Sequence, residues 1–183
     1  MIPTREQCIQ ILSDCCVPEG VRQHCLLVAK VAVRLAEALN RKGHDLNVQA
    51  IEAAALLHDI ARDKPHHARV GANLLLSKGY NEIAEIVRQH MKLDPEERDR
   101  VSEVTVVFIA DKFVEDDRIV PLEERFLKKA KTFDKSPAAM KSIEENYRTA
   151  LALQGIMEKE MGCQGGLFTF LTQQPNEEGG LPE

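Results

Sequence analysis

The sequence lacks the features of proteins that bind nucleic acids broadly. Its 183 residues include no tryptophan, and its 24 lysines and arginines are outnumbered by 29 acidic residues, which gives a net charge of −5. A mildly acidic chain has no general basic face with which to neutralise nucleic-acid phosphates. We therefore expect no nucleic-acid partner.

Long apolar segments are also missing. The longest strongly apolar stretch, residues 104–110, is far shorter than the roughly 20 residues that a membrane-spanning helix needs. The first six residues contain no apolar segment of the kind found in secretion signals. These absences predict a protein that makes no membrane contact.

The cysteines form no recognisable framework. Their number is odd, and no Cys-x-x-Cys pair occurs. Disulfides persist in oxidising compartments, and structural zinc sites use closely spaced cysteine pairs, so neither is expected here. The pattern favours a cytoplasmic protein whose thiols serve as small apolar residues. The five are Cys8, Cys15, Cys16, Cys25 and Cys163.

Hydrophobic residues recur with helical spacing along most of the chain, which predicts an all-α bundle of about eight helices. Its length suggests one domain over residues 1–160. Residues 161–183 are expected to form a tail that is loosely held, disordered or docked through residues 167–171. The strand-like residues 104–109 lie in a stretch without glycine or proline, so we expect a buried helix there. The predicted helices are 4–14, 19–41, 47–61, 65–77, 81–91, 96–114, 121–131 and 136–160.

Two polar residues interrupt the most apolar of these helices. Residues 53–61 are apolar nearly all round, as in a buried central helix, but they include His58 and Asp59. A buried carboxylate without a partner costs several kcal/mol of lost hydration. Asp59 must therefore have a partner.

Four further polar residues occupy core-facing positions on other predicted helices. His24, His67, His90 and Asp111 each lie on an apolar stripe with i, i+3, i+4, i+7 spacing. For any one of them alone, a hydrogen-bonded core residue is the simpler interpretation. Together with His58 and Asp59 they favour one or two cations, which would take the imidazole lone pairs and neutralise the carboxylates.

Two histidines fail this test. His44 follows Gly43 in the predicted loop before Asn47, so we interpret it as part of a solvated turn. His66 is adjacent to His67 but off its stripe, which predicts a side chain that is either exposed or placed behind the ligands without touching the metal. Neither is expected to bind metal directly.

The order of these residues resembles a known family. His24, the pair His58-Asp59 and then Asp111 resemble the H…HD…D signature of the HD-domain metal-dependent phosphohydrolase superfamily, over about residues 18–125. The resemblance implies an all-α HD-domain bundle in which these four residues hold one metal ion.

His67 and His90 point to a subgroup. Within PHHARVGANLL and IVRQHMKL they resemble the additional ligands of the six-ligand, binuclear branch, which includes the YqeK-like symmetrical dinucleoside tetraphosphatases. The resemblance implies that they hold a second metal, with Asp59 as the bridge. The residues after His90 and after Lys112 depart from that subgroup, so the metal site carries over better than the substrate.

The resemblance implies a phosphohydrolase that uses a metal-activated water on a nucleotide or a similar small phosphate ester. Imidazole and carboxylate ligands favour iron or manganese over zinc, nickel or magnesium. With Asp59, we expect Arg62, one predicted helical turn after His58, and Lys112, beside Asp111, to take part in catalysis by binding the substrate phosphate. Weaker basic candidates are Lys64, Arg88, Arg118 and Arg125, each of which alone is a typical solvated charge.

Other functions fit the same ligands. They include a symmetrical dinucleoside tetraphosphatase, a non-catalytic sensor of nucleotides or second messengers, and a di-iron oxygenase on the same fold. The sequence leaves the choice between monomer and homodimer open. In every case the expected partner is a small molecule, and in the leading interpretation it is a phosphate substrate, first of all a nucleotide.

Overall fold

The computed structural model describes residues 1–163 and 165–173, and this part is almost wholly helical. The all-α prediction is confirmed, and residues 104–109 lie within a helix. The helices are α1 (Arg5–Asp14), α2 (Glu19–Asn40), α3 (Val48–Leu57), α4 (His67–Ser77), α5 (Asn81–Gln89), α6 (Glu103–Phe113), α7 (Leu122–Thr132), α8 (Pro137–Met161) and α9 (Gly166–Thr172), with a 3-10 turn at Pro95–Glu97. Two short antiparallel strands, β1 (Val114–Glu115) and β2 (Arg118–Ile119), follow α6.

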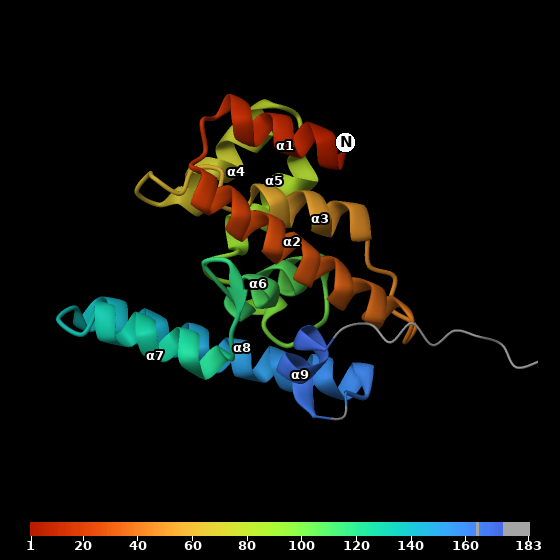
Figure 1. The fold of residues 1–183 in the computed structure, drawn as a ribbon, viewed down its shortest axis with the longest axis vertical. Helices are drawn as coiled ribbons and strands as arrows, with labels where there is room; N and C mark the ends of the chain where they lie inside the picture. Colours follow the sequence, from red (N-terminus) through yellow and green to blue (C-terminus); the bar gives the residue numbers. More distant parts are fainter. Residues whose placement is uncertain (164, 174–183) are drawn as a thin grey trace, which may run out of the picture.

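The centre of the molecule is formed by α2, α3 and α6, which pack against one another. Helices α1, α4 and α5 cover one side of this centre, and α7, α8 and α9 lie on the other side (Figure 1). Alanines on α3 are almost fully buried, which lets the backbones of α2 and α3 approach closely. Helices α7 and α8 form an antiparallel hairpin whose far end extends beyond the rest of the bundle (Figure 1).

Several helix starts follow from local capping. Thr4 caps α1 and exchanges hydrogen bonds with Gln7, as its sequence predicts, and Ser136 caps α8. The predicted helix 96–114 was wrong in its first turns, because Ser102 forms a capping box with Thr105 that starts α6 at Glu103. Asn81 is the first helical residue of α5 rather than its cap.

The largest difference from the predicted helices lies between α3 and α4. Helix α3 ends at Leu57, and the chain continues through tight turns whose backbone bonds join residues three apart, including Arg62 N–H to Asp59 C=O. His66 adopts a left-handed conformation with φ of 54°, so α4 begins at His67 and not at Pro65. His58 and Asp59 therefore lie in the segment of tight turns after α3. The prediction that Arg62 follows His58 by one turn of the same α-helix was wrong.

The segment after α8 contributes to the core. Leu167 and Leu171 of α9 are buried, and the Arg34 guanidinium lies 4.7 Å from the Phe170 ring centroid. Arg34 also donates a hydrogen bond to the carbonyl of Leu171. Residues 167–171 thus pack against the helical core, which was one of the predicted alternatives. Of the predicted tail, residues 164 and 174–183 lie outside the described residues.

No helix within the described ranges is both long enough and apolar enough to cross a membrane.

Candidate metal centre

Six polar side chains meet at the middle of the bundle, where an all-apolar core would be expected. They come from α2, the turn after α3, the start of α4, the end of α5, and α6. Their convergence places four imidazoles and two carboxylates among buried aliphatic side chains. The six are those predicted as ligands, His24, His58, Asp59, His67, His90 and Asp111.

The first cluster consists of His24, His58 and Asp59, whose potential ligand atoms all lie within 4.8 Å of one another. Asp111 adjoins it, with Oδ1 3.2 Å from His24 Nε2 and 3.7 Å from His58 Nε2. The side chains of His58, Asp59 and Asp111 are at most 5% exposed, and that of His24 is 12% exposed.

The second cluster consists of Asp59, His67 and His90, again with ligand atoms within 4.8 Å of one another. Asp59 Oδ1 lies 3.2 Å from His67 Nε2 and 3.5 Å from His90 Nε2, and the two Nε2 atoms are 3.1 Å apart. Asp59 therefore belongs to both clusters, with Oδ1 facing the second cluster and Oδ2 lying 3.6 Å from His58 Nε2 in the first.

Hydrogen bonds fix which nitrogen of the two buried rings faces the carboxylates. His58 Nδ1 donates to the carbonyl of Ala55 and His90 Nδ1 donates to the carbonyl of Val87, each at 2.8 Å. A carbonyl can only accept, so in a neutral ring the lone pair is on Nε2, which points into the clusters. Within the described residues, the buried Nε2 of His58 makes no hydrogen bond.

The charges of the site are consistent with cation binding. Burial opposes ionisation of Asp59, but His58, His67 and His90 together hold the pKa of this carboxyl far below its usual range. Burial likewise opposes ionisation of Asp111, and Lys112 and Arg125 hold its pKa well below the usual range. Two buried carboxylates thus stay ionised beside lone-pair donors, which is the ligand chemistry that a divalent or transition metal requires.

The two buried histidines differ in protonation. Burial lowers the pKa of His90 to about 4, so its ring is neutral at ordinary pH and its lone pair is free. For His58 burial acts in the same direction, but the Asp59 carboxylate outweighs it and raises the pKa well above the usual value. A proton and a metal ion compete for such a lone pair, so metal binding there would release a proton. The residues present therefore fit metal ions.

The position of Lys112 corrects one prediction. Lys112 is 1% exposed, and its ammonium donates to Asp111 Oδ2 at 2.6 Å and to the carbonyl of His90 at 2.8 Å. It also lies 4.5 Å from the centroid of the Phe108 ring. Lys112 is therefore not in reach of a substrate, and it instead ties α6 to the end of α5 beside both clusters.

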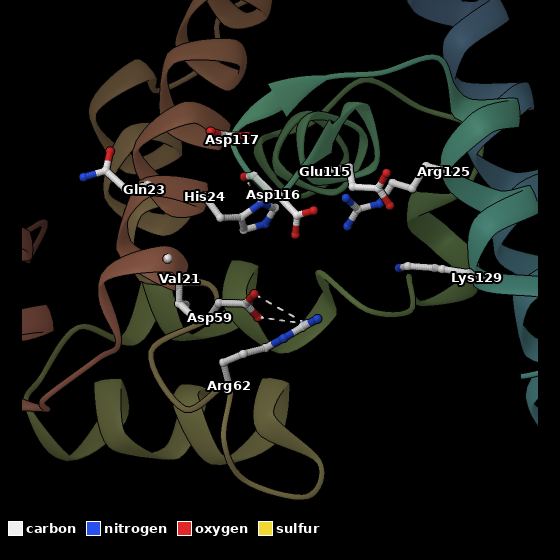
Figure 2. Close-up of a pocket in the computed structure, with 11 residues that line it drawn as sticks. Val21, Gln23, His24, Asp59, Arg62, Glu115, Asp116, Asp117, Arg125 and Lys129 are labelled. Atoms are coloured by element: carbon white, nitrogen blue, oxygen red, sulfur yellow. Dashed lines mark hydrogen bonds and ion pairs between the residues drawn. The ribbon is translucent and has the colours of Figure 1, made fainter. Parts of the chain in front are cut away.

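A pocket of about 740 Å³ opens beside the first cluster, with His24 and Asp59 in its wall. Figure 2 shows basic side chains on one side of it: Arg62 from the turn after α3, and Arg125 and Lys129 from α7. Arg62 Nη1 lies 3.4 Å from Asp59 Oδ2, and its side chain is 49% exposed. The opposite side carries the polar and acidic residues Gln23, Asp116 and Asp117, whereas Glu115 lies beside Arg125.

Of the basic candidates, Arg62 lines this pocket, and so does Arg125, which was a weaker candidate. Lys129 was missed, because helical periodicity does not show where a helix packs relative to a distant cluster. The other weak candidates form ion pairs on the surface: Lys64 with Asp63, Arg88 with Glu85 and Asp94, and Arg118 with Glu115 and Glu124.

The two histidines set aside in the sequence lie away from the clusters. His44 is in the loop between α2 and α3, 3.7 Å from Glu160, and His66 is exposed. Adjacent residues His66 and His67 therefore point to different environments, because the left-handed backbone at His66 precedes the first turn of α4.

Comparison with known proteins supports the same interpretation. The model of the HD domain family matches residues 21–116, slightly more than half of the chain. The chain belongs to the HD domain family. HD domains are typically metal-dependent hydrolases, and the six converging residues of this HD domain all lie within the matched region.

Two curated relatives match parts of this HD protein. An uncharacterised protein of Methanocaldococcus jannaschii is 38% identical over 90 residues, which are 47% of this chain and 53% of that protein. A tRNA (cytidine(56)-2'-O)-methyltransferase of Picrophilus torridus is 32% identical over 140 residues, 67% of this chain and 40% of that protein. The chain thus spans about half of the first relative and two fifths of the second. No solved structure matches it significantly.

Proposed function

We propose that this HD protein is a metal-dependent phosphohydrolase that acts on a nucleotide or a similar small phosphate ester. The proposal rests on the position of the metal-binding clusters next to a basic pocket. Buried His/Asp clusters that suit metal ions open directly onto a pocket with three basic side chains. Metal ligands alone would fit a sensor or an oxygenase equally well, whereas the adjoining cations favour a phosphate ligand.

Two metal positions are proposed, as in the six-ligand branch of the family. His24, His58 and Asp59, with Asp111, would hold one ion, and Asp59, His67 and His90 would hold the other. When bound, such ions acidify water to give a nucleophile and offset the charge of phosphoryl oxygens. Mixed imidazole and carboxylate ligands without thiolates favour iron or manganese.

The protein's own residues have distinct tasks in this scheme. Asp59 offers one carboxylate oxygen to each cluster, so it couples the two positions. Lys112 holds Asp111 in place from the buried side, and the carbonyls of Ala55 and Val87 orient the rings of His58 and His90. Arg62, half-exposed above Asp59, can turn its planar guanidinium toward a phosphate in the pocket.

The partial match to a tRNA-modifying protein does not change this substrate class. The Picrophilus protein has that activity in its name, but this chain covers only two fifths of it. The pocket carries acidic residues along one side, which would repel the neighbouring phosphates of an RNA strand. A small-molecule phosphate is the better proposal.

The test is a hydrolysis screen of nucleotides, dinucleotides and sugar phosphates with protein reconstituted with iron or manganese. We expect phosphate release from at least one phosphate ester, and its loss when the metal is chelated. Release that is unaffected by chelation, or the absence of release from every phosphate tested, would contradict the proposal. Aerobic turnover of phosphonates or polyols without phosphate-ester hydrolysis would instead support the oxygenase alternative.

A further inference from the structure

We propose that α7 provides the substrate-binding wall of this site, and that Lys129, together with Arg125 and Arg62, holds a single phosphoryl group of a phosphomonoester. The inference rests on the proposed function and narrows it, because it predicts which phosphate esters the pocket accepts. It concerns residues of α7, Leu122–Thr132, which lie beyond the region that matches the HD family.

Lys129 and Arg62 converge on the pocket from two different elements. Figure 2 shows Lys129 extending from α7 and Arg62 from the turn after α3, with their charged ends directed into the space beside Asp59. Arg125 lies one turn before Lys129 on the same helix and donates to Asp111 Oδ1 at 3.2 Å. α7 thus reaches from the ligand Asp111 to the mouth of the pocket.

Part of the hydrogen-bonding and ion-pairing capacity of α7 is unused among the described residues. Lys129 is partly buried, yet it forms no ion pair with any residue in the described ranges. Arg125 is 7% exposed, and its buried Nε has no hydrogen-bond partner there either. Arg125 does pair with Asp111 through Nη2, so what stays unsatisfied is its Nε–H and the half-buried ammonium of Lys129. Leaving such groups without acceptors is costly, and a phosphoryl group offers several oxygens that would accept hydrogen bonds from them.

The charge environment of Lys129 supports this point. Burial, followed by the positive charges of Lys112 and Arg125, lowers the pKa of Lys129 to about 7. Its neighbour Lys128, by contrast, is exposed and pairs with Glu115 at 3.3 Å. Two adjacent lysines of α7 therefore differ, and only Lys129 faces the pocket without an anion.

The side of the pocket opposite Lys129 carries acidic and polar side chains. Asp116 and Asp117, at the tip of the turn between β1 and β2, line it together with Gln23. Carboxylates there repel a second phosphate but accept hydrogen bonds from hydroxyl or amino groups. Among the described residues that line the pocket there is no phenylalanine or tyrosine, and the only aromatic ring is that of the candidate ligand His24, so no free aromatic side chain is available on which a base would stack. The fitting ligand therefore has one phosphoryl group at the basic wall and a hydroxyl-rich leaving group at the acidic side.

The experiment measures binding and turnover separately on manganese-loaded protein. Calorimetric titration uses inorganic phosphate and tripolyphosphate as probes, and turnover is measured with a sugar monophosphate and with diadenosine tetraphosphate. We expect the wild type to bind phosphate more tightly than tripolyphosphate and to hydrolyse only the monoester. Lys129→Gln should weaken phosphate binding about tenfold, and Lys129→Arg should restore most of it.

Matched variants complete the design. Lys131→Gln, which removes an exposed lysine of the same helix, should bind phosphate within twofold of the wild type. Asp117→Asn should strengthen tripolyphosphate binding several-fold with little effect on phosphate. Equal phosphate affinity of Lys129→Gln and Lys131→Gln would overturn the role of Lys129, and tighter binding of tripolyphosphate than of phosphate by the wild type would overturn the restriction to one phosphoryl group.

The outcomes also separate this inference from the proposed function. If the protein hydrolyses no ester but binds phosphate in a way that depends on Lys129, the proposed activity is rejected and the phosphate-binding role of α7 is supported. If the Lys129→Gln variant hydrolyses esters and binds phosphate as tightly as the wild type, the proposed activity is supported and the role of Lys129 is rejected.

Discussion

The region that matches the HD family and the helices that follow it contribute different chemistry to the same cavity. Residues 21–116 carry all six candidate ligands, most of them nearly inaccessible and held by backbone carbonyls or by Lys112. Helix α7 carries Arg125 and Lys129, which face the cavity without a full set of partners. The candidate metal ligands thus lie within the shared fold, while the substrate recognition that we propose depends on a helix outside it.

The two regions should therefore respond differently to substitution. Variants within 21–116 are expected to lose metal and activity together, whereas variants at the pocket wall should lose substrate binding with the metal retained. Measuring metal content beside turnover for every variant makes the comparison quantitative.

The largest effect is expected for Asp59→Ala. Among the described residues, Asp59 alone belongs to both clusters, so its removal should empty at least one metal position and lower turnover at least about a thousandfold, or about 4 kcal/mol in the barrier. Elemental analysis and phosphate release assay the two consequences. Turnover above about a tenth of the wild-type rate would show that Asp59 is not shared by two ions.

Lys112→Met should act on stability as well as on metal. The substitution keeps the volume but removes a buried ammonium, which leaves one side of Asp111 and the His90 carbonyl unsatisfied. Breaking a buried charge pair costs about 3–5 kcal/mol, so the free energy of unfolding should fall by about 3 kcal/mol and metal content should decrease. Denaturant titration and elemental analysis test this. If the variant keeps its stability and metal content and only its turnover falls, Lys112 would instead have the substrate-binding role first predicted for it.

His67→Ala should remove one metal position and leave the other. His67 contacts only the second cluster, so the variant is expected to keep about one ion per chain. His66→Ala is the matched control, since His66 is exposed and adjacent in sequence, and His44→Ala is a second control in a distant loop. Equal losses in the His66 and His67 variants would mean that the start of α4 is displaced by one residue.

The smallest of these effects is expected for Arg62→Ala. Its guanidinium is half-exposed and close to Asp59, so turnover should fall roughly ten- to a hundredfold, about 1.4–2.8 kcal/mol, with metal content unchanged. Steady-state kinetics together with metal analysis measures both. Loss of metal in this variant would assign Arg62 to the support of Asp59 and not to the pocket.

The sequence predicted which polar residues converge in the core because buried polar residues conflict with an apolar helical stripe. His24, His90 and Asp111 were found in this way, and the structure brings them together. The local geometry around Asp59 could not be predicted, since periodicity continues through residues 58–61 while the backbone has already left the helix at Leu57.

The basic residues show the limit more sharply. Lys112 follows a ligand in the sequence, yet its ammonium turns inward to Asp111, because a buried carboxylate needs a counter-charge. Lys129 resembles any surface lysine of an amphipathic helix, and its position at the pocket depends on how α7 packs against α6. Distances between elements far apart in the chain are tertiary information, which no local pattern contains.

The central claim is that one buried site in this HD protein holds two metal ions that share Asp59. Its most direct test is the number of ions per chain after anaerobic reconstitution with iron or manganese, measured by elemental analysis on the wild type and on His67→Ala. The account predicts a value approaching two for the wild type and about one for the variant. A wild type that binds no iron, manganese or zinc, or a variant with the same metal content as the wild type, would contradict it.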